Sequence, residues 1–195
     1  MMVERDADNS SEVLFFSDKA QCYKTRISEF DQTKASQLGE YVPAKLGFDD
    51  GERVVGMAII DEYRESENII FIFENGKGIR IPTLSYQTKT NRRKLTGAFS
   101  NASPAAAIIH EREPLELMLV NDQNRAIVIS SGLIPIKTTR SAGGVQLMNL
   151  KPKQRIVRVS IGADNNYPNI SKCVKSKLPA TPVLLEAPQM KIDLE

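Results

Sequence analysis

The same order of strands and turns occurs three times along this sequence, at a spacing of roughly 50 residues. Each unit opens with an apolar run, turns through a few polar residues and continues as a second run, followed by a basic loop and two more strand-like runs. A fixed period of this size is typical of a propeller or another array of small β units. Because one unit alone buries too little apolar surface, the three are expected to pack together.

The opening runs, at residues 13–16, 69–73 and 117–120, are rich in the aromatic and branched residues that favour strands. Asn75 and Gly76 follow the second of these runs, and they predict a type I′ hairpin turn because both residues tolerate positive φ. The three opening runs and their return strands therefore predict a series of hairpins.

The remaining runs also fit strands, including residues 41–48 and 53–60 of the first unit. No segment shows sustained helical periodicity, so the predicted fold is all-β, with about three four-stranded units. Apolar residues that begin equivalent strands are predicted to lie in the core: Phe15, Phe16, Phe71, Phe73, Leu117 and Leu119.

Composition bounds the class of protein. A chain of 195 residues with 41% hydrophobic residues is enough for one domain with a real core. No apolar run has the length needed to cross a bilayer, and the acidic N-terminus lacks a signal peptide, so we expect a cytoplasmic protein. Cys22 and Cys173 are far apart and lack metal-site spacing, so neither a disulfide nor a metal site is expected.

The net charge of +2 hides a division of the chain into an acidic and a basic part. Residues 1–67 carry 15 acidic and 8 basic side chains, whereas residues 68–195 carry 9 acidic and 18 basic ones. Charged loops often serve only solubility. Here, however, the basic residues are clustered in equivalent loops of consecutive units: Lys89, Arg92, Arg93 and Lys94 in one, and Lys137 and Arg140 in the next. Such a row of cations is suited to the phosphates of a nucleic-acid duplex.

Three phrases carry a family resemblance: FFSDKAQCYKTRISEF, LGFDDGERVVGM, and LMLVNDQNRAIVIS with the TTRSAGGVQLMNLKPKQRIVRV that follows it. They resemble the repeats in the C-terminal domain of type IIA bacterial topoisomerases, namely the A subunit of DNA gyrase and its topoisomerase IV counterpart. The resemblance covers residues 12 to about 162. It implies a β-pinwheel, a propeller-like disc whose four-stranded blades exchange a strand with their neighbours and whose rim binds and bends duplex DNA.

The resemblance also implies contact residues. The family's basic position on the second strand matches Lys24 and Arg80, while the third unit has Val128 there, with Arg125 nearby. The family's arginine before a small-Gly pair matches Arg140. At the same loop position the first unit has Lys34 and the second has Arg92 and Arg93. The clustering of basic residues adds three more candidate DNA contacts: Lys89, Lys94 and Lys137.

One departure from the family pattern concerns the basic box that gyrase uses for wrapping. The segment YQTKTNRRKLTGAF keeps the paired arginines, but most of the surrounding glycines are replaced. This favours a topoisomerase IV type of role, in which the domain steers the DNA segments that are engaged. The implied partners are duplex DNA, the parent topoisomerase core and its ATPase subunit, on the bacterial nucleoid in the cytoplasm.

No catalytic site is expected in this chain. There is no GxSxG, HExxH or phosphate-loop motif, and none of the five tyrosines follows an arginine, as the cleavage tyrosine of these enzymes does. His110, the single histidine, is interpreted as structural. No cofactor is expected here, whereas the parent enzyme would use ATP and Mg²⁺. A protein-binding adaptor and a small β-rich hydrolase remain as alternatives.

The domain limits follow from the repeats. Residues 1–11 are expected to be an N-terminal segment, and residues 12–163 a DNA-binding pinwheel domain with units at about 12–64, 67–113 and 115–162. Residues 164–195, which contain prolines and lysines, are expected to form a connector or tail. Since three units do not close a full disc, the domain is expected to be an open arc or a part of a larger ring.

Overall fold

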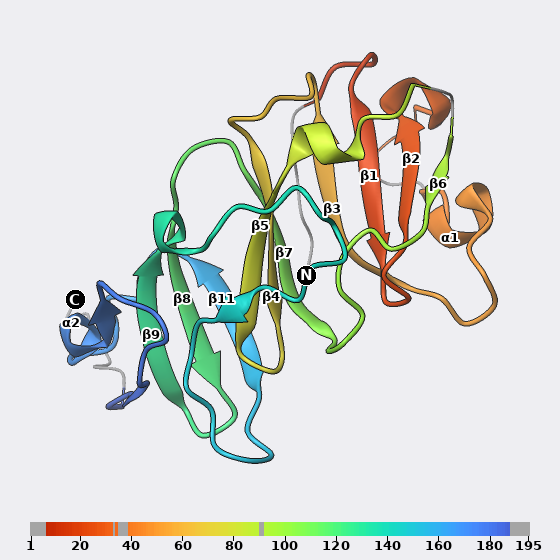
Figure 1. The fold of residues 1–195 in the computed structure, drawn as a ribbon. Coiled ribbons are helices and arrows are strands. Elements are labelled where there is room, and N and C mark those ends of the chain that lie inside the picture. Colours follow the sequence, from red (N-terminus) through yellow and green to blue (C-terminus); the bar gives the residue numbers. More distant parts are fainter. Residues whose placement is uncertain (1–6, 33, 35–38, 90–91, 188–195) are drawn as a thin grey trace, which may run out of the picture.

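The computed structural model describes residues 7–32, 34, 39–89 and 92–187. These residues form three β-sheets that stand side by side in a row (Figure 1). The outer parts of both predicted terminal segments, residues 1–6 and 188–195, lie outside the described residues. The prediction of an all-β fold with three blades is confirmed.

Each sheet, here called a blade, is built around an antiparallel hairpin. Blade 1 has the strand order β3 (Val54–Ile60), β1 (Glu12–Ser17), β2 (Cys22–Arg26) and β6 (Lys94–Leu95). Blade 2 has the order β7 (Ala105–Glu111), β4 (Asn68–Phe73), β5 (Lys77–Pro82) and β10 (Val145–Gln146). Blade 3 has the order β11 (Ile156–Ile161), β8 (Glu116–Asn121), β9 (Arg125–Ser130) and β12 (Val174–Lys175), and β13 (Val183–Leu184) also pairs with β9.

The fourth strand of a blade comes from the next unit along the chain. After β5, the chain of the second unit crosses to blade 1, where Lys94 and Leu95 pair with Tyr23 and Cys22 of β2. After β9, the chain of the third unit crosses in the same way to blade 2, where β10 pairs with β5. The crossing from β9 to β10 can be followed in Figure 1. The strand exchange implied by the family resemblance is therefore present.

The three hairpins share one turn, which differs from the type I′ turn predicted at Asn75 and Gly76. In each turn the backbone N–H of the third loop residue donates to the backbone carbonyl of the last residue of the first strand. That third residue has positive φ. The residue is Ala20 (φ 54°), Gly76 (φ 83°) or Asn124 (φ 53°). These are three-residue loops with one left-handed position, so the prediction of a hairpin was right and the turn type was wrong.

The strand predicted at residues 41–48 was also wrong, because this segment contains the short helix α1 (Val42–Leu46). Pro43 is in the first helical turn, where its missing N–H costs nothing, and Gly47 ends the helix in the left-handed conformation (φ 66°). The ring of Phe48 then stacks on Tyr23 at 3.9 Å. Packing on blade 1 thus overrides the local strand preference.

The other short helical segments follow second strands or lie near the C-terminus. A 3₁₀ turn comes after each hairpin: η1 (Ile27–Glu29), η2 (Thr83–Tyr86) and η3 (Ser131–Leu133). The helix α2 (Ile170–Cys173) comes directly before β12. None of the helices in the described ranges is long and apolar enough to cross a membrane.

The core lies between the blades. Strand β4 is buried on both faces: Phe71 lies in a cluster with Leu14 and Phe16 of blade 1, and Ile70 in a cluster with Leu117 and Leu119 of blade 3. Phe71 makes an edge contact with Phe16 at 5.3 Å and stacks on Phe99 at 4.9 Å. All six predicted core residues are buried, which confirms that prediction.

The strand order defines two opposite edges of the row, an inner edge formed by β3, β7 and β11 and an outer edge on the other side of the hairpins. Strands β3, β7 and β11 form one edge of their sheets, and β3 packs against β7 and β7 against β11. The exchanged strands β6 and β10 and the strand β13 lie on the opposite side of their hairpins. We call this opposite edge the rim.

A core substitution tests the packing between the blades. We expect Phe71→Ala to destabilise the fold by about 3–5 kcal/mol, because it removes a large side chain that contacts two blades and leaves a cavity. This corresponds to a fall in Tm of roughly 10 °C or more in thermal unfolding. Val157→Ala, at a side chain that is half exposed, is the control and should change Tm little. Equal effects of the two substitutions would contradict the assignment of the core.

Candidate nucleic-acid interface

Two chain segments carry the predicted basic clusters along the rim. The first rim segment is residues 83–98, of which 90 and 91 lie outside the described residues; it begins at blade 2 and pairs with blade 1. The second is residues 131–148, which run from blade 3 to blade 2. Each follows the second strand of one blade and pairs with the second strand of the blade before it. The backbone N–H of Lys24 donates to the carbonyl of Arg93 (2.7 Å), and that of Arg80 donates to the carbonyl of Pro135 (3.1 Å).

Neither rim segment contains an aspartate or a glutamate, whereas together they contain six basic side chains. Four of these are exposed: Lys89, Arg92, Arg93 and Lys137. The guanidinium of Arg93 lies 3.2 Å from the carboxylate of Glu29, with 70% of the arginine side chain exposed. An exposed pair of this kind contributes at most about 1 kcal/mol, so Arg93 can exchange it for a phosphate.

Lys94 is held more firmly than its neighbours. Its Nζ lies 3.1 Å from both carboxylate oxygens of Asp49 and 5.2 Å from the ring centre of Tyr23. Hydrogen bonds from Gln21 and Lys94 hold the pKa of Asp49 below its usual range. Lys94 therefore lies on the rim with its charge partly balanced by an acidic neighbour.

Arg140 joins the two rim segments. Its guanidinium donates to the backbone carbonyl of Ser85 (3.1 Å) and lies over the ring of Tyr86, 5.9 Å from the ring centre. Ser85 and Tyr86 belong to η2, where the first rim segment begins. The two basic segments are thus in direct contact, and no sequence pattern indicates this anchor.

Lys24 and Arg80 lie at equivalent positions, and both side chains are mostly buried, with 5% of the Lys24 side chain and 13% of the Arg80 side chain exposed. The Nζ of Lys24 pairs with Glu12 at 3.2 Å and donates to the carbonyl of Tyr86. Arg80 pairs with Glu111 at 3.3 Å and donates to the carbonyl of Ile134 (2.7 Å). Loss of the partner of a buried cation is strongly destabilising, so we interpret these two side chains as stabilising the blades. Lys24 and Arg80 are therefore no longer candidates for DNA contact.

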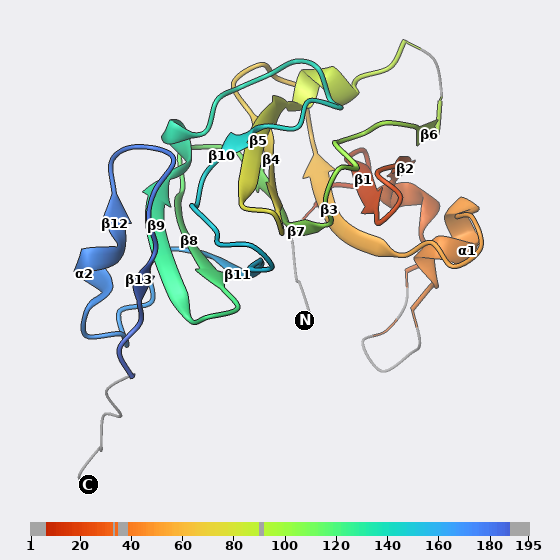
Figure 2. The ribbon, with the colours of Figure 1, turned by 60° about the horizontal axis from the view of Figure 1, so that its bottom comes forward.

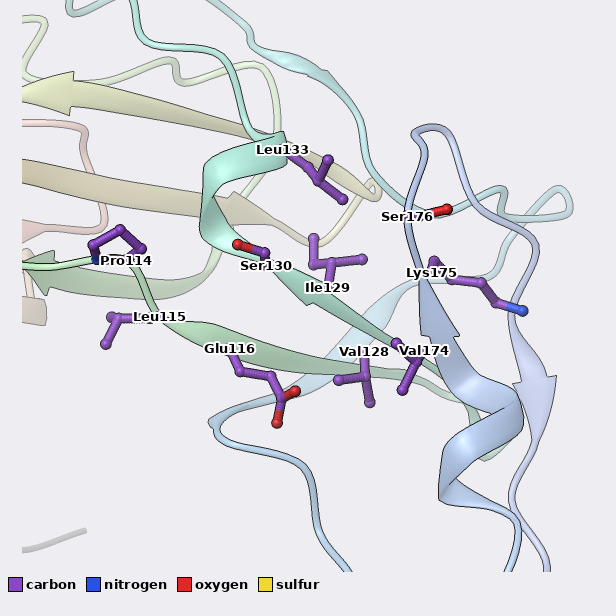
Figure 3. Close-up of a pocket in the computed structure, with 10 residues that line it drawn as sticks. All are labelled: Pro114, Leu115, Glu116, Val128, Ile129, Ser130, Leu133, Val174, Lys175 and Ser176. Atoms are coloured by element: carbon purple, nitrogen blue, oxygen red, sulfur yellow. The ribbon is translucent and has the colours of Figure 1, made fainter.

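At the third equivalent position, Val128 leaves a groove on the rim of blade 3 (Figure 3). In blade 2, Arg80 spans this region to reach the backbone of η3, whereas Val128 is short and apolar. The groove has a volume of about 490 Å³ and lies between the end of β9 and β12, with Leu133 and Val174 among its lining residues. At this position blade 3 therefore differs from blades 1 and 2, because it has an apolar side chain and a groove where they have a cation.

The last two predicted contacts do not lie on the rim segments. Arg125 begins β9 at the hairpin turn, so it is at the opposite end of that strand from η3, where the second rim segment starts. Its guanidinium donates to the carbonyl of Pro182 (3.5 Å). Lys34 is exposed in the segment between η1 and α1, most of whose neighbouring residues are not described.

The described residues offer little for catalysis. Within them, no three histidine, cysteine or acidic side chains are grouped so that they could hold a metal ion. His110 on β7 lies 3.0 Å from the carboxylate of Glu67, and burial lowers the pKa of this imidazole. Burial also raises the pKa of the Cys22 thiol. These groups are packed into the blades, as expected for structural residues.

Comparisons with known proteins agree with this geometry. The family model described as DNA gyrase C-terminal domain, beta-propeller, matches residues 11–61 and 115–162, which together make up just over half of the chain. The A subunit of DNA gyrase from Metamycoplasma arthritidis (strain 158L3-1) is 24% identical over 174 residues. That match covers 83% of this chain and 18% of the relative, so the chain spans less than a fifth of its length.

Two solved structures share the fold. The crystal structure of the C-terminal domain of DNA topoisomerase IV has a TM-score of 0.69 and 21% identity, over 82% of this chain and 49% of that one. The structure of a DNA gyrase A C-terminal domain has a TM-score of 0.58 and 14% identity, over 88% of this chain and 58% of that one. These likenesses confirm the β-pinwheel prediction. On the family match, the chain belongs to the DNA gyrase C-terminal domain, beta-propeller family.

Proposed function

We propose that this domain binds duplex DNA through phosphate contacts along its rim and helps to bend it, as a non-catalytic part of a type IIA topoisomerase. The observation that carries the proposal is the contact between two rim segments that contain six basic and no acidic side chains. All six cations are exposed or partly exposed, and five of them are the proposed phosphate contacts: Lys89, Arg92, Arg93, Lys94 and Lys137. Arg140 fixes the two segments relative to each other.

Phosphate contacts of this kind position a duplex without reading its sequence. Smooth bending of a site of 20 to 30 base pairs costs on the order of 1–6 kcal/mol, which contacts made only along the curve must offset. Lys94 lies on β6, and backbone hydrogen bonds tie Arg93 to Lys24 and Lys137 to Arg80. These three cations lose little backbone freedom on binding, because the backbone that carries them is already held by the blades. A stiff basic rim is therefore suited to a bent duplex.

The role in the cell is proposed from the sequence. The paired arginines Arg92 and Arg93 lack the surrounding glycines of the gyrase wrapping box, so we propose a topoisomerase IV type of role. The proposed partners are a topoisomerase core and its ATPase subunit, with ATP and Mg²⁺ used by that parent enzyme and no cofactor bound by this domain. The proposed location is the bacterial cytoplasm, on the nucleoid.

Charge reversal on the rim tests the DNA site. We expect Arg92→Glu with Arg93→Glu to weaken the binding of a duplex of about 40 base pairs roughly tenfold, because two phosphate contacts become repulsive. Fluorescence anisotropy of the labelled duplex measures this change. The β circular dichroism should not change, since both side chains are exposed.

The matched control carries the same change in charge on another surface. Lys151 and Lys153 are exposed in the turn before β11, at the hairpin end of blade 3. Lys151→Glu with Lys153→Glu should weaken binding much less than the rim variant does. Equal losses would place the DNA away from the rim, and absence of binding by the unmodified domain would favour the protein-binding alternative.

The salt dependence of binding supplies a second prediction. The logarithm of the binding constant should fall linearly with the logarithm of salt concentration, with a slope of about −0.9 for each phosphate neutralised. The slope of the Arg92→Glu, Arg93→Glu variant should be less steep by about two. Anisotropy titrations at several salt concentrations give both slopes. A slope near zero for the unmodified domain would rule out binding through phosphates.

The division of labour with a parent enzyme gives a third prediction. Because the chain lacks an Arg-Tyr cleavage motif, the purified domain should neither relax nor cleave supercoiled plasmid in the presence of ATP and Mg²⁺. Gel electrophoresis of the plasmid measures both activities. Relaxation that depends on ATP would refute the assignment of a binding role.

A further inference from the structure

The segment after β11, which no part of the family match covers, packs on the outer face of blade 3. Cys173 and Leu185 are buried there in one apolar cluster with Met118 and Val128. Figure 2 shows α2, β12 and β13 beside β9 of blade 3. The sequence predicts a connector at residues 164–195, yet their described part forms α2, β12 and β13 against β9. The pairing of this segment with β9 resembles the pairing of another segment of the same molecule with β5.

Its backbone pairs repeat those of the second rim segment. Ile136 forms a parallel bridge with Arg80 of β5, and Val174 pairs in parallel with Val128 of β9. The strand β10 pairs antiparallel with the start of β5, as β13 does with the start of β9.

Single hydrogen bonds match as well. The N–H of Leu147 donates to the carbonyl of Gly76 (2.8 Å), and the N–H of Leu185 donates to that of Asn124 (3.0 Å). In all three comparisons the incoming residue lies 38 positions further along the chain, from 136, 145 and 147 to 174, 183 and 185. This constant offset makes residues 169–185 a third rim segment.

The first two rim segments follow a hairpin of their own unit, β4–β5 or β8–β9. The third has none, because only eight residues separate Ile161, the end of β11, from Ile170, the start of α2. Each blade hairpin of this protein spans 15 residues, at 12–26, 68–82 and 116–130, so eight residues are too few for one. The C-terminal segment therefore corresponds to a fourth unit that has lost its hairpin and kept its exchanged strand.

The third rim segment resembles the others in charge. At the offset of 38, the second rim segment corresponds to residues 169–186, which contain one acidic residue, Glu186, and three lysines: Lys172, Lys175 and Lys177. At the same offset of 38, Lys175 takes the place of Lys137, which is exposed on the second rim segment. Lys175 is partly exposed and is one of the residues that line the groove in Figure 3, and its Nζ donates to the backbone carbonyl of Lys172 (3.1 Å). Lys172 is 70% exposed, and its Nζ lies 3.7 Å from the carboxylate of Glu186.

The corresponding chain of the first unit behaves differently. After η1, the residues of this stretch that the structure describes supply no strand to another sheet. The helix α1 folds back, and Val42 and Leu46 pack on the outer face of blade 1. Residues 27–53 carry six acidic and three basic side chains. Basic composition thus goes with the exchanged position, and not with the loops of this protein in general.

We propose that residues 169–185 form a reduced fourth unit that fills the open edge of blade 3 and extends the DNA-binding rim across all three blades through Lys172, Lys175 and Lys177. The structural half of this proposal, the filled edge, is independent of the proposed function. The other half, contact of the three lysines with DNA, rests on the proposed function. Two experiments separate the halves.

The first experiment measures duplex affinity with Lys175→Glu and Lys177→Glu in the full chain. We expect a several-fold loss, comparable to that of the Arg92→Glu, Arg93→Glu variant, and a salt slope less steep by about two. Binding equal to that of the unmodified protein, with the Arg92→Glu, Arg93→Glu variant impaired, would overturn the rim extension alone. If the unmodified protein does not bind duplex, the proposed function fails with it.

The second experiment tests the filled edge without DNA. A protease site is inserted after Gly162, before the segment packs on blade 3, and the folded protein is cut there. After the cut, the C-terminal fragment should stay bound to the rest of the protein and elute with it in gel filtration. Leu185→Asp should make the fragment dissociate. A fragment that dissociates freely after cleavage would overturn the structural half of the proposal.

Discussion

The structure depends on one backbone interaction, the pairing of each blade's second strand with chain from the following unit. A strand with unpaired N–H and C=O groups at the edge of a sheet is a liability, and here the edges of β2, β5 and β9 are all at least partly filled. The segments that fill the edges of β2 and β5 each leave one blade and pair with the blade before it, so they also link neighbouring blades. The arrangement of the row therefore follows from strand pairing together with the apolar packing between sheets.

The same segments carry the charge, which connects the fold to the proposed function. A segment on the rim is exposed to solvent, and several cations of the first two rim segments are exposed, including Arg93 and Lys137. Cations on the hairpin strands behave differently, since Lys24 and Arg80 are neutralised by Glu12 and Glu111 inside the blades. Position in the sheet decides whether a basic residue stabilises the protein or can reach a phosphate.

The sequence predicted the three hairpins and their buried apolar residues, because runs such as 69–73 are apolar on both faces and are followed by polar turns. It did not reveal the burial of Arg80, whose partner Glu111 is distant in sequence and becomes a neighbour only through the pairing of β4 with β7. The helix α1 was missed because packing on blade 1 decided the conformation of an ambiguous segment. The third rim segment was missed because the hairpin that would mark a fourth repeat is absent from the sequence.

The central claim is that a duplex lies along the rim, and chemical protection of lysines tests it most directly. Lysines are acetylated with and without a saturating duplex, and mass spectrometry measures the modification of each one. The account predicts protection of Lys89 and Lys137 on the two rim segments, with Lys151 and Lys153 modified equally in both samples. Protection of Lys151 and Lys153, with the rim lysines unchanged, would contradict it.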